Sequence, residues 1–215
     1  MSTRANRDRT STGGARAGFL LGCTLLVGCA LAAAGCARGG RSAAHLHRLY
    51  GLAPPLAFTL QDAASGATVT AAAFRDRVVM LYFGYTHCPD VCPTTLAKLA
   101  AAVRELPAAD RDRVRIAFVT VDPARDPLAV LRAYAAAFGP EVVGLRGTRR
   151  QIDRLAARYR VTYAFGAPNA RGNYDVTHSS AVFIFGRDGR SAAVVEPSDG
   201  VAAIRMTLNR LASRA

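Results

Sequence analysis

Runs of apolar residues alternate along this chain with stretches in which apolar residues recur every three or four positions. Runs made up mainly of apolar residues predict buried strands, and they cover residues 77–85, 113–121, 142–145 and 181–185. Between and after them, helical spacing predicts amphipathic helices, at residues 96–106, 126–139, 148–159 and 201–211. This alternation indicates an α/β fold, a mixed sheet flanked by helices on both faces.

Two hairpins are expected to complete the sheet. Short strands at 56–60 and 68–70 flank a segment rich in turn residues and predict an N-terminal β-hairpin. The run at 181–185, the turn sequence GRDG and residues 191–196 predict an antiparallel hairpin near the C-terminus.

Cap residues indicate where two of the helices begin. Asp126 is expected to cap the helix that follows it, with Pro127 in the first turn, where a missing N–H costs nothing. Thr148 and Gln151 have the spacing of a capping box.

The N-terminus has the pattern of a targeting segment. Residues 1–16 are polar and basic, and residues 17–35 follow without a charge. At about 1.5 Å per residue, an apolar helix of that length just crosses the hydrocarbon core of a bilayer. We therefore predict a signal or anchor segment at 1–37, a tether at 38–55 and a folded domain at 56–215.

Two cysteines of this segment are candidates for lipidation. Cys29 ends the sequence LVGC, which resembles a bacterial lipoprotein box, and Cys36 ends the looser match AAGC, which polar residues follow. The alternative is a plain anchor helix with incidental cysteines. Both interpretations tether the domain to a membrane, on its periplasmic or outer side.

Charge and cysteine content exclude two classes of protein. The formal net charge is +13, but the basic residues are spread thinly, and no basic run is longer than Arg149–Arg150. We therefore predict a solvated basic surface and no nucleic-acid partner. The cysteines fall into an N-terminal group and a pair in the body, which does not suggest a disulfide scaffold.

The candidate chemistry lies in FGYTHCPDVCPTT, residues 83–95. Cys88 and Cys92 follow a buried strand and precede a helix, at the edge of an α/β sheet where ligands bind. The positive end of a helix dipole lowers a thiol's pKa and favours the thiolate, which binds metals and attacks disulfides. If the stretch is close to one turn of helix, both side chains share a face. Three outcomes stay open: a disulfide, a soft-metal site, or two inert thiols.

A metal held by two sulfurs needs a third ligand, and the body offers His87 and His178. His178 directly precedes the strand predicted at 181–185, so it can lie at the same edge of the sheet as the two cysteines. Two thiolates and one imidazole suit copper, as Cu(I) or Cu(II), whereas a structural zinc site would want a fourth ligand. His87 adjoins Cys88, and neighbouring side chains diverge. His45 and His47 fall in the predicted tether and are not expected to take part.

At these positions the chain resembles the SCO/SenC family of thioredoxin-like copper chaperones. Three blocks carry the resemblance, in the family's order and within residues 50–213, and they read YFGYTHCPDVCPTTL, FVTVDPARDPLAVLRAYAAAF and YDVTHSSAVFIFGRDG. The resemblance implies a thioredoxin-like fold in which Cys88, Cys92 and His178 bind one copper ion and the two cysteines can form a redox disulfide. It implies a membrane-tethered protein, not an enzyme, that helps assemble the binuclear copper centre of cytochrome c oxidase subunit II. Because oxidation of the pair would abolish binding, an extracytoplasmic thiol reductant is expected as a second partner.

The chain departs from the family pattern beside the histidine. Many members have Asp directly before that ligand, where this chain has Thr177, with Asp175 two residues further back. An acidic neighbour can orient an imidazole, so the departure bears on copper affinity and redox potential more than on ligation. We expect Asp90, Asp122 and Asp175 to support the ligands from outside, with Asp90 and Asp122 fixing loops.

Two other roles would use the same residues. A thiol–disulfide oxidoreductase or peroxidase-like enzyme would need Cys88 and Cys92 but not His178. A membrane-tethered copper or redox sensor would need the same ligands as the chaperone. Replacing His178 by Ala distinguishes the enzyme from the chaperone. Measuring oxidase activity after gene deletion, with and without added copper, distinguishes the sensor from the chaperone.

Overall fold

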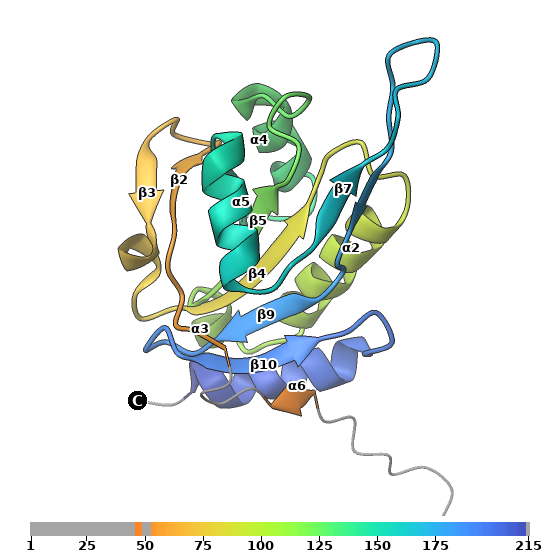
Figure 1. Ribbon diagram of the computed structural model, residues 1–215. Coiled ribbons are helices and arrows are strands. Elements are labelled where there is room, and N and C mark those ends of the chain that lie inside the picture. Colours follow the sequence, from red (N-terminus) through yellow and green to blue (C-terminus); the bar gives the residue numbers. More distant parts are fainter. Residues whose placement is uncertain (1–45, 49–52, 214–215) are drawn as a thin grey trace, which may run out of the picture. The chain divides into compact units, whose positions relative to one another are not determined.

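The computed structural model of the protein describes residues 46–48 and 53–213 (Figure 1). Within these residues, strands form one mixed sheet in the order β1-β10-β9-β4-β5-β6-β2-β3, and β7 and β8 form a separate hairpin. The strands are β1 (His47–Arg48), β2 (Thr59–Asp62), β3 (Thr68–Thr70), β4 (Val78–Gly84), β5 (Val114–Thr120), β6 (Val142–Arg146), β7 (Tyr163–Phe165), β8 (Val176–His178), β9 (Val182–Phe185) and β10 (Ser191–Val195). The helices are η2 (Ala71–Phe74), α2 (Val91–Arg104), α3 (Ala108–Arg111), α4 (Leu128–Ala136), α5 (Arg149–Arg158) and α6 (Val201–Ala212).

Strands β4, β5 and β6 run parallel at the centre of the sheet, and β9 joins β4 antiparallel. Every residue of β4 is buried, as the continuous apolar run in the sequence predicts for a strand covered on both faces. Gly84 of β4 pairs with Thr120 of β5, so the carboxyl ends of these two strands lie side by side. That edge of the sheet positions the candidate site.

Helices cover both faces of the sheet. On one face, Phe118 of β5 stacks on Tyr82 of β4 and on Tyr134 of α4, and α2 and α6 pack against each other there. On the other face, Tyr159 at the end of α5 stacks on Phe183 and Phe185 of β9. Figure 1 shows α5 in front of β4 and β5. The β4-α2-β5 unit followed by α5, β9, β10 and α6 is a thioredoxin-like arrangement, which confirms the expected fold class.

The predicted N-terminal hairpin is present, with β2 and β3 paired antiparallel, and so is the hairpin of β9 and β10. The capping box of α5 is also confirmed. The Thr148 hydroxyl accepts a hydrogen bond from the backbone N–H of Gln151, and the backbone N–H of Thr148 donates to the side-chain oxygen of Gln151. Helix α2 begins at Val91, ahead of Leu96, the first residue of the apolar periodicity in the sequence.

The start of α4 corrects one prediction. The N-cap is Pro127, without a side-chain hydrogen bond, and not Asp126. Asp126 is fully buried and accepts hydrogen bonds from Thr86 and Thr120 instead. Its carboxylate therefore serves the loops at the end of β4 and β5, and not the helix that follows it in sequence.

The predicted targeting segment, with Cys29 and Cys36, lies outside the described residues, as does His45. Among the residues that are described, no helix is both long and apolar enough to cross a bilayer. His47 pairs with Val194 in β1 and β10. A two-residue strand therefore lies within the range predicted as a tether.

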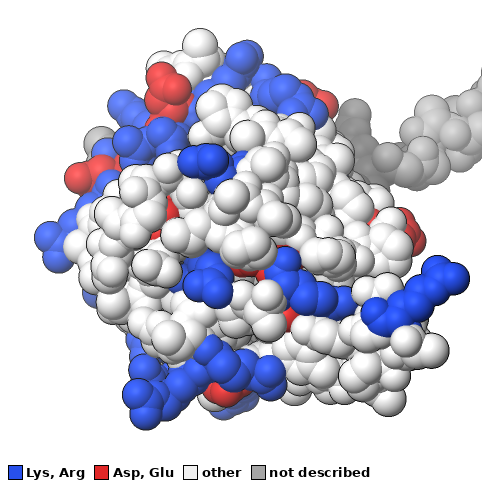
Figure 2. All heavy atoms as spheres, turned by 90° about the horizontal axis from the view of Figure 1, so that it is seen from above, with Lys and Arg blue, Asp and Glu red and all other residues white. Residues whose placement is uncertain are grey.

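Positive charge on the face seen from above in Figure 2 is dispersed. Blue side chains occur at several separate places, with broad uncharged surface between them. This distribution agrees with the thin spread of arginines along the sequence.

Candidate metal centre

The loop after β4 carries both cysteines to the edge where β4 and β5 end. Cys88 lies in the loop and is half-buried, whereas Cys92 is the second residue of α2 and is fully buried. The two residues are therefore not part of one helical turn. They are nevertheless adjacent, because the backbone N–H of Cys92 points at the Cys88 sulfur, with 3.4 Å between N and Sγ. Both thiols are free.

His178 meets the pair from a different element than the sequence suggests. It is the last residue of β8, in the separate hairpin, and does not stand at the start of the sheet strand β9. Its Nε2 lies 3.2 Å from the Cys92 Sγ. The ligand atoms of Cys88, Cys92 and His178 all lie within 4.8 Å of one another. The structure thus brings together the three residues that the sequence selects.

The tautomer of His178 follows from its second hydrogen bond. Its Nδ1 lies 3.0 Å from the carbonyl oxygen of Ser179. A carbonyl only accepts, so Nδ1 carries the proton and donates, which leaves the Nε2 lone pair directed at Cys92. An imidazole held in this way is oriented to bind a metal through Nε2.

Burial favours the uncharged forms of Cys92 and His178. Desolvation raises the pKa of the Cys92 thiol to about 12. It also lowers the pKa of His178, partly opposed by the hydrogen bond to Ser179. The helix-dipole argument predicts a lowered pKa for the cysteine pair, but at Cys92 the loss of water outweighs it. A metal ion bound here must displace the Cys92 proton, so binding is expected to weaken as the pH falls.

The donor set fits a soft, low-coordinate ion. Two sulfurs and one imidazole are donors that copper accepts, and among the described residues no other His, Cys, Asp or Glu joins the three. His87 is not a fourth ligand, because its Nδ1 lies 3.4 Å from Asp126 Oδ1 and its side chain is half-exposed. Zinc in a structural site would lack a protein ligand.

Reactivity toward an alkylating reagent should differ between the two thiols. We expect Cys88 to react with iodoacetamide at least about tenfold faster than Cys92 at pH 8, because the buried Cys92 is almost wholly protonated. Peptide mass spectrometry of the reduced protein over time measures both rates. Equal rates would show that the Cys92 environment is more open than its burial indicates.

Gly84 leaves the space that the Cys92 sulfur occupies. A Cβ at this position would lie 2.9 Å from Cys92 Sγ and 2.6 Å from the Phe118 ring. Around the imidazole, the Tyr85 ring stands perpendicular at 6.0 Å and the Tyr82 ring lies edge-on at 6.2 Å between centroids. The ligands therefore sit in a packed aromatic environment that resists displacement.

Replacing Gly84 by Ala is expected to destabilise the protein by about 1–3 kcal/mol, because the added methyl overpacks the sulfur and the ring. Urea unfolding measures the change. Gly166→Ala is the control, since a Cβ there would meet only ordinary contacts at 3.4 Å or more. An equal loss for both variants would contradict the close fit at Gly84.

Asp126 fixes the loop that carries Cys88. Its two carboxylate oxygens accept from the backbone N–H of Thr86, from the Thr86 hydroxyl at 2.6 Å and from the Thr120 hydroxyl. These bonds join the end of β4 to the end of β5. Because Thr86 is two residues before Cys88, the buried carboxylate constrains the approach of that ligand.

Asp122 and Arg125 fix the hairpin that carries His178. Asp122 is buried, accepts from Arg125 Nε at 2.5 Å and from the Tyr174 hydroxyl at 3.0 Å. Arg125 also donates through Nη1 to the Tyr174 carbonyl and lies over its ring at 3.6 Å. We call these three residues the inner clamp. It ties the loop after β5 to the strand that ends at His178.

A second set of residues repeats this chemistry at the other strand of the hairpin. Arg149 pairs with Asp153, Asp153 accepts from the Tyr163 hydroxyl, and Arg149 lies over the Tyr163 ring at 5.0 Å. We call these three residues the outer clamp. Its ion pair is more than half exposed, whereas that of the inner clamp is largely buried.

The other expected supporting residues lie at the surface. Asp90 precedes α2 and accepts from the Thr94 hydroxyl, and its side chain is exposed. Asp175 is exposed, and its backbone carbonyl accepts from Gly166. Thr177, which replaces the acidic neighbour of the histidine, is also exposed, since side chains alternate along β8 between Val176 and His178.

Sequence reasoning missed Arg125 and Tyr174 as positioning residues. The signal was present in the block FVTVDPARDP, where Asp122, Arg125 and Asp126 stand close together. Their partners lie 40 residues before and 49 residues after them, so only the tertiary structure reveals the roles.

Comparison with known proteins matches most of the domain. A family model described as SCO1/SenC matches residues 55–213. The mitochondrial SCO2 homolog of Mus musculus is 42% identical over 117 residues, which is 54% of this chain and 46% of that protein. The mitochondrial SCO2 homolog of Homo sapiens is 38% identical over 136 residues, 60% of this chain and 51% of that protein. The chain thus spans about half the length of the curated relatives it matches.

Two solved structures share the whole domain. ScoI of Bradyrhizobium japonicum, solved with copper bound, is 32% identical with a TM-score of 0.67, covering 74% of this chain and 99% of that one. Apo Sco1 of Thermus thermophilus is 35% identical with a TM-score of 0.66, covering 79% of this chain and 97% of that one.

Proposed function

The chain belongs to the SCO1/SenC family, and on that premise we propose that it is a copper chaperone rather than an enzyme. Cys88, Cys92 and His178 would hold one copper ion per chain and pass it to the binuclear copper centre of cytochrome c oxidase subunit II. The observation that carries this proposal is the convergence of the three donor atoms within 4.8 Å. The copper bound to the Bradyrhizobium japonicum relative supports the choice of metal.

The arrangement of the ligands suits transfer. Cys92 is fully buried, whereas Cys88 and His178 are half-buried, so Cys88 is the more accessible sulfur. A thiolate of a partner protein can therefore approach from the side of Cys88 and take its place first. Three ligands hold the ion without enclosing it, so stepwise replacement needs no unfolding of the domain.

Transfer requires both thiols to be reduced. The two sulfurs lie close enough for the pair to exchange with other disulfides after a small local shift, and a disulfide would remove both sulfur ligands. We therefore propose an extracytoplasmic thiol reductant as a partner. The membrane tether, through an apolar helix at 17–35 or lipid at Cys29 or Cys36, belongs to the same proposal.

Competition between metals tests the site. The full-length protein, with Cys23, Cys29 and Cys36 replaced by Ser so that only the domain thiols remain, is reduced and offered copper and zinc in equal amounts. We expect one copper per chain and no zinc after gel filtration, measured by elemental analysis. Retention of zinc in place of copper would overturn the proposal.

Deletion of the gene tests the role in the cell. Oxidase activity should fall and recover, at least in part, with added copper, if the protein delivers the ion. A sensor that signals through a partner would leave the defect unrepaired by copper, because the signal and not the metal would be missing.

A further inference from the structure

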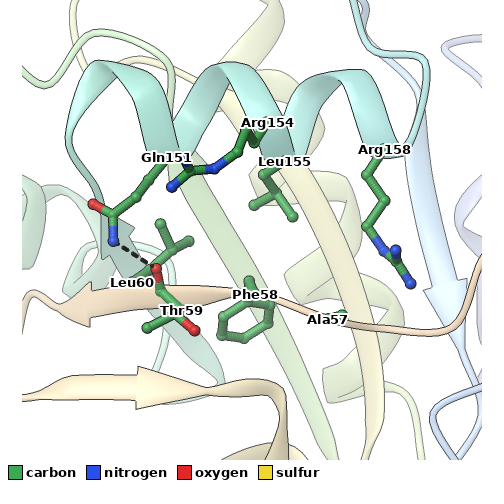
Figure 3. A pocket seen from close by; sticks show the side chains of 8 residues that line it. All are labelled: Ala57, Phe58, Thr59, Leu60, Gln151, Arg154, Leu155 and Arg158. Carbon is green, nitrogen blue, oxygen red and sulfur yellow. Dashed lines mark hydrogen bonds between the residues drawn. The ribbon is translucent and has the colours of Figure 1, made fainter.

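A groove of about 360 Å³ lies on the face of the sheet that α5 covers, opposite the face that carries α2. One wall is the segment 57–60, which leads into β2, and the other is a face of α5 (Figure 3). None of the metal-centre residues lines it. The groove therefore needs an explanation of its own.

The floor of the groove is apolar and its rim is cationic. Phe58, Leu60 and Leu155 form the floor and are almost fully buried. Arg154 and Arg158 are one helical turn apart on α5; Figure 3 shows Arg154 extending toward the Gln151 end of the groove and Arg158 toward the Ala57 end. No acidic residue lines the groove.

The two guanidinium groups are not neutralised by the protein. Among residues 46–48 and 53–213, Arg154 has no hydrogen bond, ion pair or ring contact. Arg158 donates through Nη2 to the carbonyl of Pro55 at 3.1 Å and lies 5.9 Å from the centre of the Tyr159 ring, and neither contact supplies a negative charge. Gln151 is already engaged, since its Nε2 donates to the Thr59 carbonyl at 3.1 Å. Like charges at this spacing cost a helix about 0.2–0.5 kcal/mol, which an anion at this rim would offset.

We propose that this groove binds a small anionic amphiphile, with a carboxylate or phosphate at the arginine rim formed by Arg154 and Arg158 and an apolar group on Phe58 and Leu155. Guanidinium forks match the geometry of both anions and donate paired hydrogen bonds to them. A concave apolar floor with few convergent polar groups is the usual composition of a ligand site. The anion can come from a soluble metabolite or from a lipid headgroup, and both share this chemistry.

Calorimetric titration of the full-length protein with phenyl phosphate tests the site. We expect saturable binding with Kd around 1 mM or tighter. Benzyl alcohol, which keeps the ring without the charge, should bind at least about tenfold more weakly, because charge-assisted hydrogen bonds contribute that much. Absence of saturable phenyl phosphate binding would overturn the proposal.

Matched variants on one helix locate the site. Arg154→Gln should weaken phenyl phosphate about tenfold, and adding Arg158→Gln should abolish measurable binding. Arg150→Gln removes an exposed charge of α5 that does not line the groove and should leave Kd unchanged. An equal effect of Arg150→Gln and Arg154→Gln would reduce the binding to general charge attraction and overturn the proposal.

Dihexanoyl phosphatidate, a lipid short enough to stay in solution, distinguishes the two sources. Binding at least about tenfold tighter than phenyl phosphate, and dependent on both arginines, would indicate a lipid headgroup. Affinity similar to that of phenyl phosphate would indicate a soluble anion.

Discussion

Replacing His178 by Ala is expected to weaken Cu(I) binding by the reduced protein at least about a hundredfold. Loss of a residue that only supports a metal ligand lowers affinity by up to about a hundredfold, and loss of the ligand itself should cost at least as much. The Nε2 of His178 is aimed at the Cys92 sulfur and its Nδ1 is held by Ser179, and among the described residues no other histidine joins the two cysteines. Competition against a chromophoric Cu(I) chelator measures the affinity. The variant should remain folded, because the half-buried imidazole shares its strand with other packed residues.

His87→Ala is the matched control for this experiment. His87 adjoins Cys88 in sequence, yet its ring contacts Asp126 and Thr86 and is not part of the three-residue cluster. Its loss should change Cu(I) affinity by less than about threefold, well under 1 kcal/mol. If both variants lose affinity equally, the assignment of His178 as the third ligand is wrong.

The His178→Ala variant also distinguishes a chaperone from a thiol–disulfide enzyme. Exchange of the pair with a disulfide substrate uses Cys88 and Cys92 and has no need of the imidazole as a metal ligand. We therefore expect His178→Ala to exchange thiols at a rate close to that of the unchanged protein. A variant that keeps both copper and thiol exchange would favour the enzyme over the chaperone.

The strands at the centre of the sheet could be predicted because their sequence is unambiguous. β4 is a continuous apolar run, and β5 is apolar apart from Arg115 and Thr120; burial on both faces favours that composition. Cys88 and Cys92 could be placed for the same reason, since they follow the end of a strand whose position was clear. The site was predictable where local sequence dictates local structure.

The hairpin of β7 and β8 could not be found in this way. Each strand has three residues, YAF and VTH, which is too short for an apolar run or an alternation to identify it as a strand. Phe165 stacks on Tyr174 within the hairpin, and Arg125, 49 residues before Tyr174, lies over the Tyr174 ring and donates to its carbonyl. His178 could be selected as a ligand without knowledge of the element that carries it.

Tertiary environment also overrode two local rules. Asp126 stands where a helix cap is expected, but the buried hydroxyls of the neighbouring loops compete for its carboxylate. Cys92 stands in the first turn of a helix, yet burial raises the pKa of its thiol to about 12. The local sequence therefore predicts neither the hydrogen-bond partners of a buried carboxylate nor how far a thiol is exposed to water.

Replacing Arg125 by Gln is expected to destabilise the protein by about 2–4 kcal/mol and to weaken Cu(I) binding by the folded fraction. The variant leaves the buried Asp122 carboxylate without its ion-pair partner, and breaking a largely buried pair from one side carries a cost of this order. It also frees Tyr174, four residues before His178, from the loop after β5. Urea unfolding gives the stability, and chelator competition, corrected for the folded fraction, gives the affinity.

The outer clamp provides the control, because it has the same chemistry with its ion pair exposed. Arg149→Gln removes a guanidinium that pairs with Asp153 and lies over Tyr163, but both members of that pair are more than half exposed. Solvent and salt screen such a pair, so its loss should cost at most about 1 kcal/mol and leave Cu(I) affinity unchanged. Equal effects of the two variants would mean that burial does not decide the strength of these clamps. A large stability loss in Arg125→Gln with unaltered Cu(I) affinity would mean that the inner clamp stabilises the fold without positioning His178.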